Sequence, residues 1–268
     1  MIAPINKIKS LLSEDVVSLL GDDVINNAYL NAYKVVVNLI SDDNVLESLF
    51  KSGISSSLFS TVYGGVTDGL CQFNQEGYAD KRRILSVQRK NSMGLDHDDE
   101  FYECYKISTL KGETCAVNKN SMYYENDRWD PKFFITKDSK ISILPLDIHD
   151  ASGGTRIPKA TIYWISSPSF DPTEERLTFN LAEKNISSLT AEEEHELFLG
   201  IPSGAQELVY IELVLTLAQS YMADFVYSEE DQELAKLVSD QVAFLSIKKK
   251  DEVDFVVATY GNPGVIKQ

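Results

Sequence analysis

The chain has little cysteine, little basic charge and few recognisable site motifs. Its 268 residues include three cysteines, Cys71, Cys104 and Cys115, with no CxxC or Cys/His ligand spacing. Neither a disulfide framework nor a zinc site is predicted, and the odd number indicates synthesis in a reducing cytosol. Against 41 Asp and Glu residues stand 25 Lys and Arg residues, a formal net charge of -16. Such an acidic chain is not expected to wrap nucleic acid by neutralising phosphates.

Catalytic and phosphate-binding signatures are also missing. The glycine-rich segments GGVTDG and ASGG do not match a P-loop, and Ser152 lies outside a GxSxG elbow. His97 in DHDDE and His149 in DIHD lie among carboxylates, which makes a small metal-binding or hydrolytic module the alternative hypothesis. No HExxH or 2-His-1-carboxylate spacing accompanies them, so solvated acidic loops are favoured. His195 is interpreted as a surface ion pair, and no enzyme, cofactor or metal ligand is predicted.

A long uncharged apolar run is absent too. The N-terminus has no continuous hydrophobic region of the kind found in signal peptides. The most apolar stretch, residues 204–232, is interrupted at Glu207, Glu212, Gln219 and Asp224. A membrane span is therefore not expected, and no membrane partner is predicted.

On a helix, this stretch is apolar around most of its circumference. Steps of 100° per residue place Glu212, Thr216 and Gln219 on one narrow polar stripe. We expect the helix to be the central member of a bundle, with the polar stripe facing either water or a neighbouring subunit.

Helical periodicity occupies both ends of the chain. An amphipathic helix is predicted from the N-terminus to Leu19, a long helix over 23–39 and a shorter one reaching Phe50. Thr190 and Glu193 have capping-box spacing, and Ser228 with Asp231 begins the last helix. That helix is expected to have one apolar face, made of Leu234, Leu237, Val238, Gln241, Val242 and Leu245. Beyond Lys250, residues 253–260 resemble a strand.

Strand-like spacing occupies the middle. The predicted strands are RRILSVQRK, MYYEN, the pair Phe133–Ile135 and Ile141–Leu144 joined as a hairpin, ATIYWISSPS and RLTFNLA. Residues 52–69 are interpreted as a loop, and residues 96–109 as a short helix between strands. Helices, strands and helices in that order predict an α+β fold, in which a helical bundle of both chain ends carries an inserted β-rich subdomain. The predicted parts are 1–77, 78–182, 183–250 and a C-terminal arm at 251–268.

Three further groups of residues are candidate contacts. Arg82, Arg83 and Arg89 form a basic strand that either meets an acidic partner or protects a sheet edge. Trp129 with Phe133 is either an interface anchor or the minor core of the β subdomain. The predicted interface is completed by Glu212, Thr216 and Gln219 on the central helix and by Val256 and Tyr260 in the C-terminal arm.

The pairing of AQELVYIELVLTLAQSYMADF with SEEDQELAKLVSDQVAFLSIKKK, together with VINNAYLNAYKVVVNLI, resembles the helices of head-to-tail adaptor (connector or neck) proteins of tailed bacteriophages. DPKFFITKDSKISILPL is similar to segments of virion neck proteins. The resemblance covers the helical half of the chain, and the long β insertion departs from the smallest adaptors.

This resemblance implies a structural virion protein without chemistry. The family forms a ring, usually a dodecamer, between the portal protein and a tail or nozzle protein, and lines the channel through which DNA passes. A location in the virion neck after synthesis in the host cytoplasm is expected, and another neck or tail completion protein is the related alternative. An acidic lumen suits the channel, because like charge opposes tight binding of passing DNA.

Overall fold

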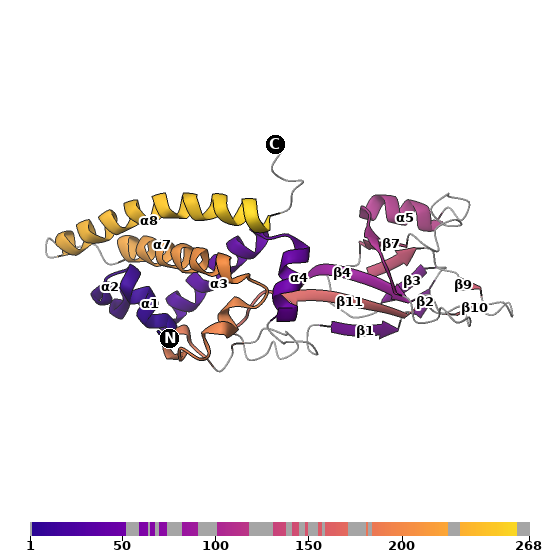
Figure 1. The fold of residues 1–268 in the computed structure, drawn as a ribbon, viewed down its shortest axis with the longest axis horizontal. Coiled ribbons are helices and arrows are strands. Elements are labelled where there is room, and N and C mark those ends of the chain that lie inside the picture. The colour runs from indigo at the N-terminus through magenta and orange to yellow at the C-terminus, as the bar shows by residue number, and fades with distance from the viewer. Residues whose placement is uncertain are drawn as a thin grey trace. The chain divides into compact units, whose positions relative to one another are not determined.

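The computed structural model describes most of the helical regions and parts of the central region. The described residues are 2–51, 59–63, 65–67, 70–73, 82–90, 101–117, 131–137, 141–144, 148–149, 155–156, 159–170, 181, 184–224 and 231–261. The chain divides into two compact units: Met1–Ile54 with Ser167–Gln268, and Ser55–Ser166. The α+β class is confirmed (Figure 1). The limits of the strand-bearing unit differ from the predicted 78–182.

The first unit is helical. Its α-helices are α1 (Pro4–Leu11), α2 (Glu14–Leu19), α3 (Asp22–Leu39), α4 (Asp42–Lys51), α7 (Gln206–Asp224) and α8 (Asp231–Tyr260). Three short 3-10 turns precede α7: η1 (Ile186–Ser188), η2 (Glu194–Phe198) and η3 (Ser203–Ala205). The helices predicted over 23–39 and up to Phe50 are confirmed as α3 and α4. The prediction of a single N-terminal helix was wrong. Leu12 is extended, and a new helix begins after Ser13 with Glu14 and Asp15 in its first turn.

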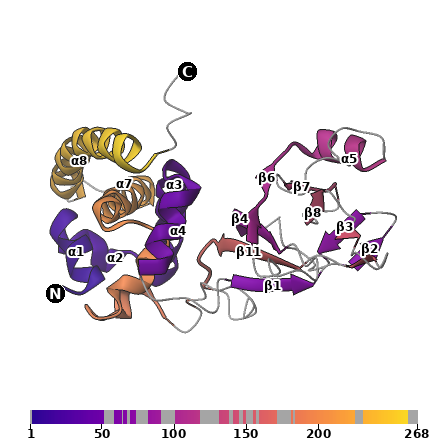
Figure 2. The same ribbon diagram turned by 45° about the vertical axis from the view of Figure 1, so that its right-hand side comes forward.

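Helix α7 is buried on most sides, as predicted. It contacts α1, α3 and α8, and Figure 2 shows it enclosed by these three helices. Its buried hydrophobic residues are Leu208, Val209, Tyr210, Ile211, Leu213, Val214, Leu215, Leu217, Ala218 and Tyr221. Among the described helices, none has the length and hydropathy needed to cross a membrane. The apolar character of α7 is therefore explained by the three helices around it.

Helix α8 corrects two predictions. It continues without interruption to Tyr260, so the strand predicted over 253–260 and the separate arm beginning at 251 are wrong over the described residues. Val256 is fully buried, and the Tyr260 carbonyl accepts hydrogen bonds from the Ser41 N–H at 2.8 Å and from Asn44 Nδ2 at 3.1 Å. The β-branched residues of this run are kept helical because tertiary packing overrides their local preference.

Buried tyrosines attach the 184–201 segment to α3. The Tyr29 hydroxyl donates to the Leu197 carbonyl and the Tyr33 hydroxyl to the Leu199 carbonyl, both at 2.8 Å. These carbonyls belong to buried residues at the end of η2, so the hydroxyls satisfy acceptors that burial would otherwise leave unpaired. Thr190 does bond Glu193, but the α-helix predicted after it is absent: a turn leads into η2.

The second unit contains the strands. One sheet has the order β1 (Phe59–Tyr63), β11 (Lys159–Ser166), β4 (Arg82–Lys90) and β5 (Phe101–Glu103). A second has the order β2 (Gly65–Thr67), β3 (Leu70–Phe73), β8 (Ile141–Leu144), β7 (Lys132–Ile135) and β6 (Tyr105–Lys106). Strands β9 (Ile148–His149) and β10 (Thr155–Arg156) form a pair, and α5 spans Thr109–Val117. The β7–β8 hairpin is confirmed, with Phe133 opposite Ile143.

Several central predictions were wrong. Residues 52–69 contain β1 and β2, and residues 96–109 contain β5 and β6 in place of the short helix. The predicted strand at 122–126 and nearly all of the one at 176–182 lie outside the described residues. The core of this unit contains Val87, Cys104, Phe133, Phe134, Ile141, Ile143, Leu144, Ile162 and Trp164.

Replacing a buried residue of α7 with a charge should unfold the helical unit. Leu217 is fully buried, and Leu217→Asp is expected to lower the free energy of unfolding by about 3–5 kcal/mol, because the carboxylate has no buried partner. Urea denaturation checks this. Gln219→Asp, at an exposed position of the same helix, is the matched control, with an expected change within about 0.5 kcal/mol. Equal unfolding midpoints for both variants would contradict the central position of α7.

Candidate assembly surfaces

The polar stripe of α7 faces α8. Glu212 is 7% exposed, and its Oε1 lies 2.9 Å from Lys249 Nζ on α8. One turn earlier, Glu207 pairs with Lys248. Oε1 of Glu212 has no other hydrogen-bond partner, so the lysine ammonium compensates a carboxylate that burial would otherwise strongly disfavour.

The remainder of that stripe is less buried. Thr216 is partly buried and its hydroxyl donates to the Glu212 carbonyl at 2.9 Å, while Gln219 is exposed. Of the two orientations left open by the sequence, water or a neighbouring subunit, neither describes Glu212, which has an intramolecular partner. Gln219 and Thr216 remain candidates for contact with another chain.

A second apolar face lies on the outside of α8. Its four members, here called the outer stripe, are Leu237, Phe244, Ile247 and Phe255, which are 47%, 66%, 69% and 48% exposed. Leu237, Phe244 and Phe255 are separated by seven and eleven residues, spacings that return to nearly the same side of a helix. The buried face of α8 consists of Ala235, Val238, Leu245 and Val256. The outer stripe is therefore a separate surface, and the predicted apolar face that placed Leu237 with Val238 was wrong for Leu237.

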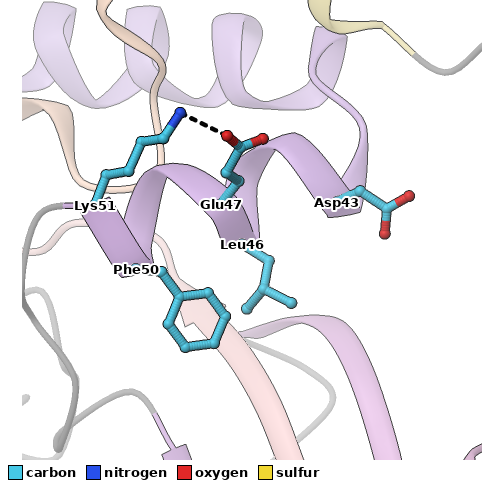
Figure 3. A pocket seen from close by; sticks show the side chains of 5 residues that line it. All are labelled: Asp43, Leu46, Glu47, Phe50 and Lys51. Carbon is cyan, nitrogen blue, oxygen red and sulfur yellow. Dashed lines mark ion pairs between the residues drawn. The ribbon is translucent and has the colours of Figure 1, made fainter.

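A smaller apolar patch lies on α4. Figure 3 shows Leu46 and Phe50 projecting from one side of this helix, while Lys51 reaches back to Glu47 on another side. The Lys51 Nζ and Glu47 Oε1 atoms are 2.5 Å apart, and Phe50 is 53% exposed. The α4 patch is thus apolar at its centre and has charged groups around it.

A partly enclosed cavity of about 370 Å³ lies beside α4. Its lining consists of Asn44, Glu47, Ser48, Lys51, His195, Phe198, Ile201, Pro202, Ser203, Gln206 and Tyr260. Gly204 allows the chain to pass beneath Tyr260, because a Cβ at this position would lie 2.4 Å from the Tyr260 hydroxyl oxygen. The volume is within the range of small-molecule sites, but the charged pair in the lining is already internally neutralised.

Charged residues stabilise the segment before α7. Lys184 Nζ bonds Glu193 at 3.1 Å and Glu196 at 2.8 Å, and these bonds raise the pKa of Lys184. The Thr190 backbone N–H, the Lys184 ammonium and the Thr190 hydroxyl lower the pKa of Glu193 to about 2. Nearby, burial and the hydrogen bond to Glu194 raise the pKa of Tyr210, so this phenol stays neutral.

The basic strand is paired on both sides only at its C-terminal end. Strand β4 pairs with β11 along its length and with β5 at Gln88–Lys90, so edge protection is excluded for Arg89 and stays open for Arg82 and Arg83. Arg83 is partly buried, and the side chains of Arg82 and Arg89 lie outside what the structure describes. These three arginines remain candidate contacts by prediction alone.

The two aromatic candidates of the central region and the two candidates in α8 have different outcomes. Phe133 is 5% exposed and belongs to the core of the strand unit, so its assignment to an interface was wrong. Trp129 lies outside the described residues. Val256, predicted as an interface residue of an arm, is buried in the helical unit for the reason given above, while Tyr260 is partly exposed and stacks edge-on against Phe255 at 6.2 Å.

Of the three histidines, the structure describes the side chain of His195 alone. His97 lies outside the described residues, and of His149 the structure describes the backbone, in β9. His195 Nδ1 lies 2.7 Å from the Glu192 carbonyl oxygen, so it is a turn residue and not the predicted ion pair. Within the described ranges, no group of three or more His, Cys, Asp or Glu side chains is arranged to hold a metal ion.

No family model, curated protein or solved structure matches this chain. The functional evidence therefore consists of the helical unit with its outer stripe and its α4 patch.

Removing the cation opposite Glu212 should be more harmful than removing both charges. Lys249 is partly exposed, so we expect Lys249→Met to lower the free energy of unfolding by about 1–3 kcal/mol, because water compensates the stranded carboxylate only in part. The double change Glu212→Leu with Lys249→Met should recover stability to within about 1 kcal/mol of the natural protein. Urea denaturation measures both. Lys250→Met, at the adjacent exposed position, is the control, and a loss as large as that of Lys249→Met would contradict the pairing.

Acid should weaken the segment before α7 as Glu193 is protonated. Its pKa is lowered from 4.5 to about 2 in the folded chain. The stabilisation is therefore present above pH 4.5 and is lost as the pH falls from about 4.5 to about 2. The free energy of unfolding, measured across this range, should depend less on pH in Glu193→Gln than in the natural protein. Glu192→Gln, at the exposed neighbouring position, should keep the natural dependence, and identical curves for all three proteins would refute the assignment.

Proposed function

We propose that this protein is a non-enzymatic assembly protein that binds further copies of itself, and that it serves as a head-to-tail adaptor in the virion of a tailed bacteriophage. The observation that carries the proposal is the outer stripe of α8. Four large apolar side chains lie on one side of a single helix and are each about half or more exposed. Large apolar side chains exposed together on one side of a helix, here with polar residues between them, mark a candidate interaction site.

The size of the outer stripe supports an interface of moderate strength. A free large apolar side chain exposes on the order of 200 Å², so the four members together expose roughly 400 Å². A standard protein interface buries about 800 Å² on each partner, somewhat more than half of it apolar. The stripe therefore supplies most of the apolar area that one such contact needs.

The fuller proposal places twelve copies in a ring between portal protein and tail or nozzle protein, in the virion neck. In this arrangement the helical bundle forms the ring, and residues 55–166 are an inserted β-rich subdomain available to neighbouring proteins. The net charge of -16 supports a channel role, because a surface of the same sign as DNA lets it pass without specific binding. In this proposal the protein binds neither a cofactor nor a membrane.

Polar substitutions in the stripe should prevent self-association without unfolding the chain. The double variant Phe244→Ser with Ile247→Ser should sediment as a monomer where the natural protein forms a larger species, because the exposed centre of the stripe is lost. Electron images of the natural protein should show rings, and images of the variant should show none.

The control is Ser246→Asp, an exposed position on another side of α8, which should assemble as the natural protein does. A natural protein that stays monomeric at every concentration would overturn the proposal. Stoichiometric metal bound to such a monomer would favour the metal-binding alternative at His97 and His149.

A further inference from the structure

We propose that the outer stripe joins two copies of this chain through a two-fold axis, with the two α8 helices antiparallel. The inference rests on the proposed self-association and specifies its geometry. It commits the stripe to one occupant, the stripe of a second copy. The argument comes from the order of residues along α8, from the polar groups between them and from the area available.

The apolar residues of the stripe are nearly symmetric about Ser246. Leu237 and Phe255 lie nine residues before and nine residues after it, while Phe244 lies two before and Ile247 one after. At 1.5 Å of rise per residue, the outer pair lies about 13 Å on either side of this midpoint. A two-fold axis through the midpoint therefore brings Leu237 against Phe255 of the partner subunit, and Phe244 beside Ile247 of the partner subunit.

Such a spacing favours the antiparallel orientation over the parallel one. A two-fold contact uses the same surface on both subunits, so the surface must be complementary to itself after rotation. Parallel helices in register would place Leu237 on Leu237 of the partner subunit and would bring each acidic residue of the stripe against its own copy. The antiparallel contact repeats the Leu237–Phe255 pair at both ends and encloses the Phe244–Ile247 pair in the middle.

Polar residues lie between the apolar members of the stripe, and in this register Lys248 lies opposite Phe244 of the partner subunit. Gln241 lies five residues before Ser246 and Asp251 five residues after it, so each Gln241 meets Asp251 of the partner subunit. The Gln241 side chain is partly buried in α8. Its amide N–H groups are donors for that carboxylate. Asp240 lies six residues before the midpoint and Glu252 six after, so like charges also approach, and salt strengthens the association by screening them.

The area is sufficient for a reversible pair. Two stripes of roughly 400 Å² bury about 800 Å² of apolar surface, close to the apolar share of a standard interface. A two-fold contact closes on itself and does not continue around a ring. A symmetric ring whose neighbours were related by such axes would have two equivalent faces. A ring between a portal protein and a tail protein has two different faces, so the two-fold pair is a contact of the free protein and is distinct from the contact that closes the ring.

Charge substitution at the two ends of the stripe tests the orientation. Leu237→Asp and Phe255→Lys each place an unpaired charge against an apolar residue of the partner subunit, twice per dimer, and each should weaken association at least about 100-fold. Combining them should restore the dissociation constant to within about tenfold of the natural value, because each introduced aspartate then meets an introduced lysine. The two positions are eighteen residues apart on one rigid helix, so they cannot pair within a chain. Sedimentation equilibrium of the full chain at several salt concentrations measures all four proteins.

The matched control is Leu237→Asp with Phe255→Asp, which changes the same two positions but offers no opposite charge and should remain dissociated. Loss in both single variants without recovery in the combined one overturns the antiparallel pairing. Unchanged association in the single variants overturns the use of the stripe while the proposed self-association stands. A natural protein that is monomeric throughout overturns both.

Discussion

Burial of α7 on most of its surface is the constraint on which the helical unit depends. A helix with so wide an apolar circumference needs covering helices on several sides, and α1, α3 and α8 supply them. The cover includes one polar position, Glu212, whose carboxylate is stabilised by the Lys249 ammonium. Lys248 binds Glu207 on the neighbouring turn. Two successive lysines thus join α8 to α7, while the buried side chains of Ala235, Val238, Leu245 and Val256 form the inward side of α8.

The segment between η1 and α7 depends on side chains for its hydrogen bonds. It has short turns in place of a regular helix, so its carbonyls depend on side chains for hydrogen bonds. Tyr29 and Tyr33 provide these bonds from the buried side, while Lys184 and Thr190 hold Glu193 from the exposed side. The two tyrosine rings fill space between α3 and this segment, and their hydroxyls donate hydrogen bonds to its carbonyls. Tyrosine thus supplies both the apolar packing and the hydrogen bonds.

Local sequence patterns predicted the elements whose burial follows a simple period. The helices α3 and α4, the apolar circumference of α7 and the β7–β8 hairpin were all found in this way. The strand predicted over 253–260 failed because β-branched residues favour strands locally, while contact of Val256 and Tyr260 with distant residues keeps the run helical. That error had a consequence for the site: a helix that ended near 250 separated Phe255 from Leu237, and the outer stripe was not visible as one surface. The partner of Glu212 was equally invisible, since Lys249 lies thirty-seven residues further along the chain.

The acidity of the chain and its apolar stripe have opposite effects on the proposed self-association. A net charge of -16 on each copy creates a repulsion that grows with every subunit added, whereas apolar burial at one contact is fixed by the area of the stripe. Repulsion between distant charges is screened by salt, but burial of Phe244 and Ile247 is not. In the proposed self-association, a weak contact of fixed size combined with a screened long-range repulsion would form reversibly and respond to salt. Such behaviour suits the proposed adaptor role, because premature polymerisation away from its neighbours would remove a component from ordered assembly.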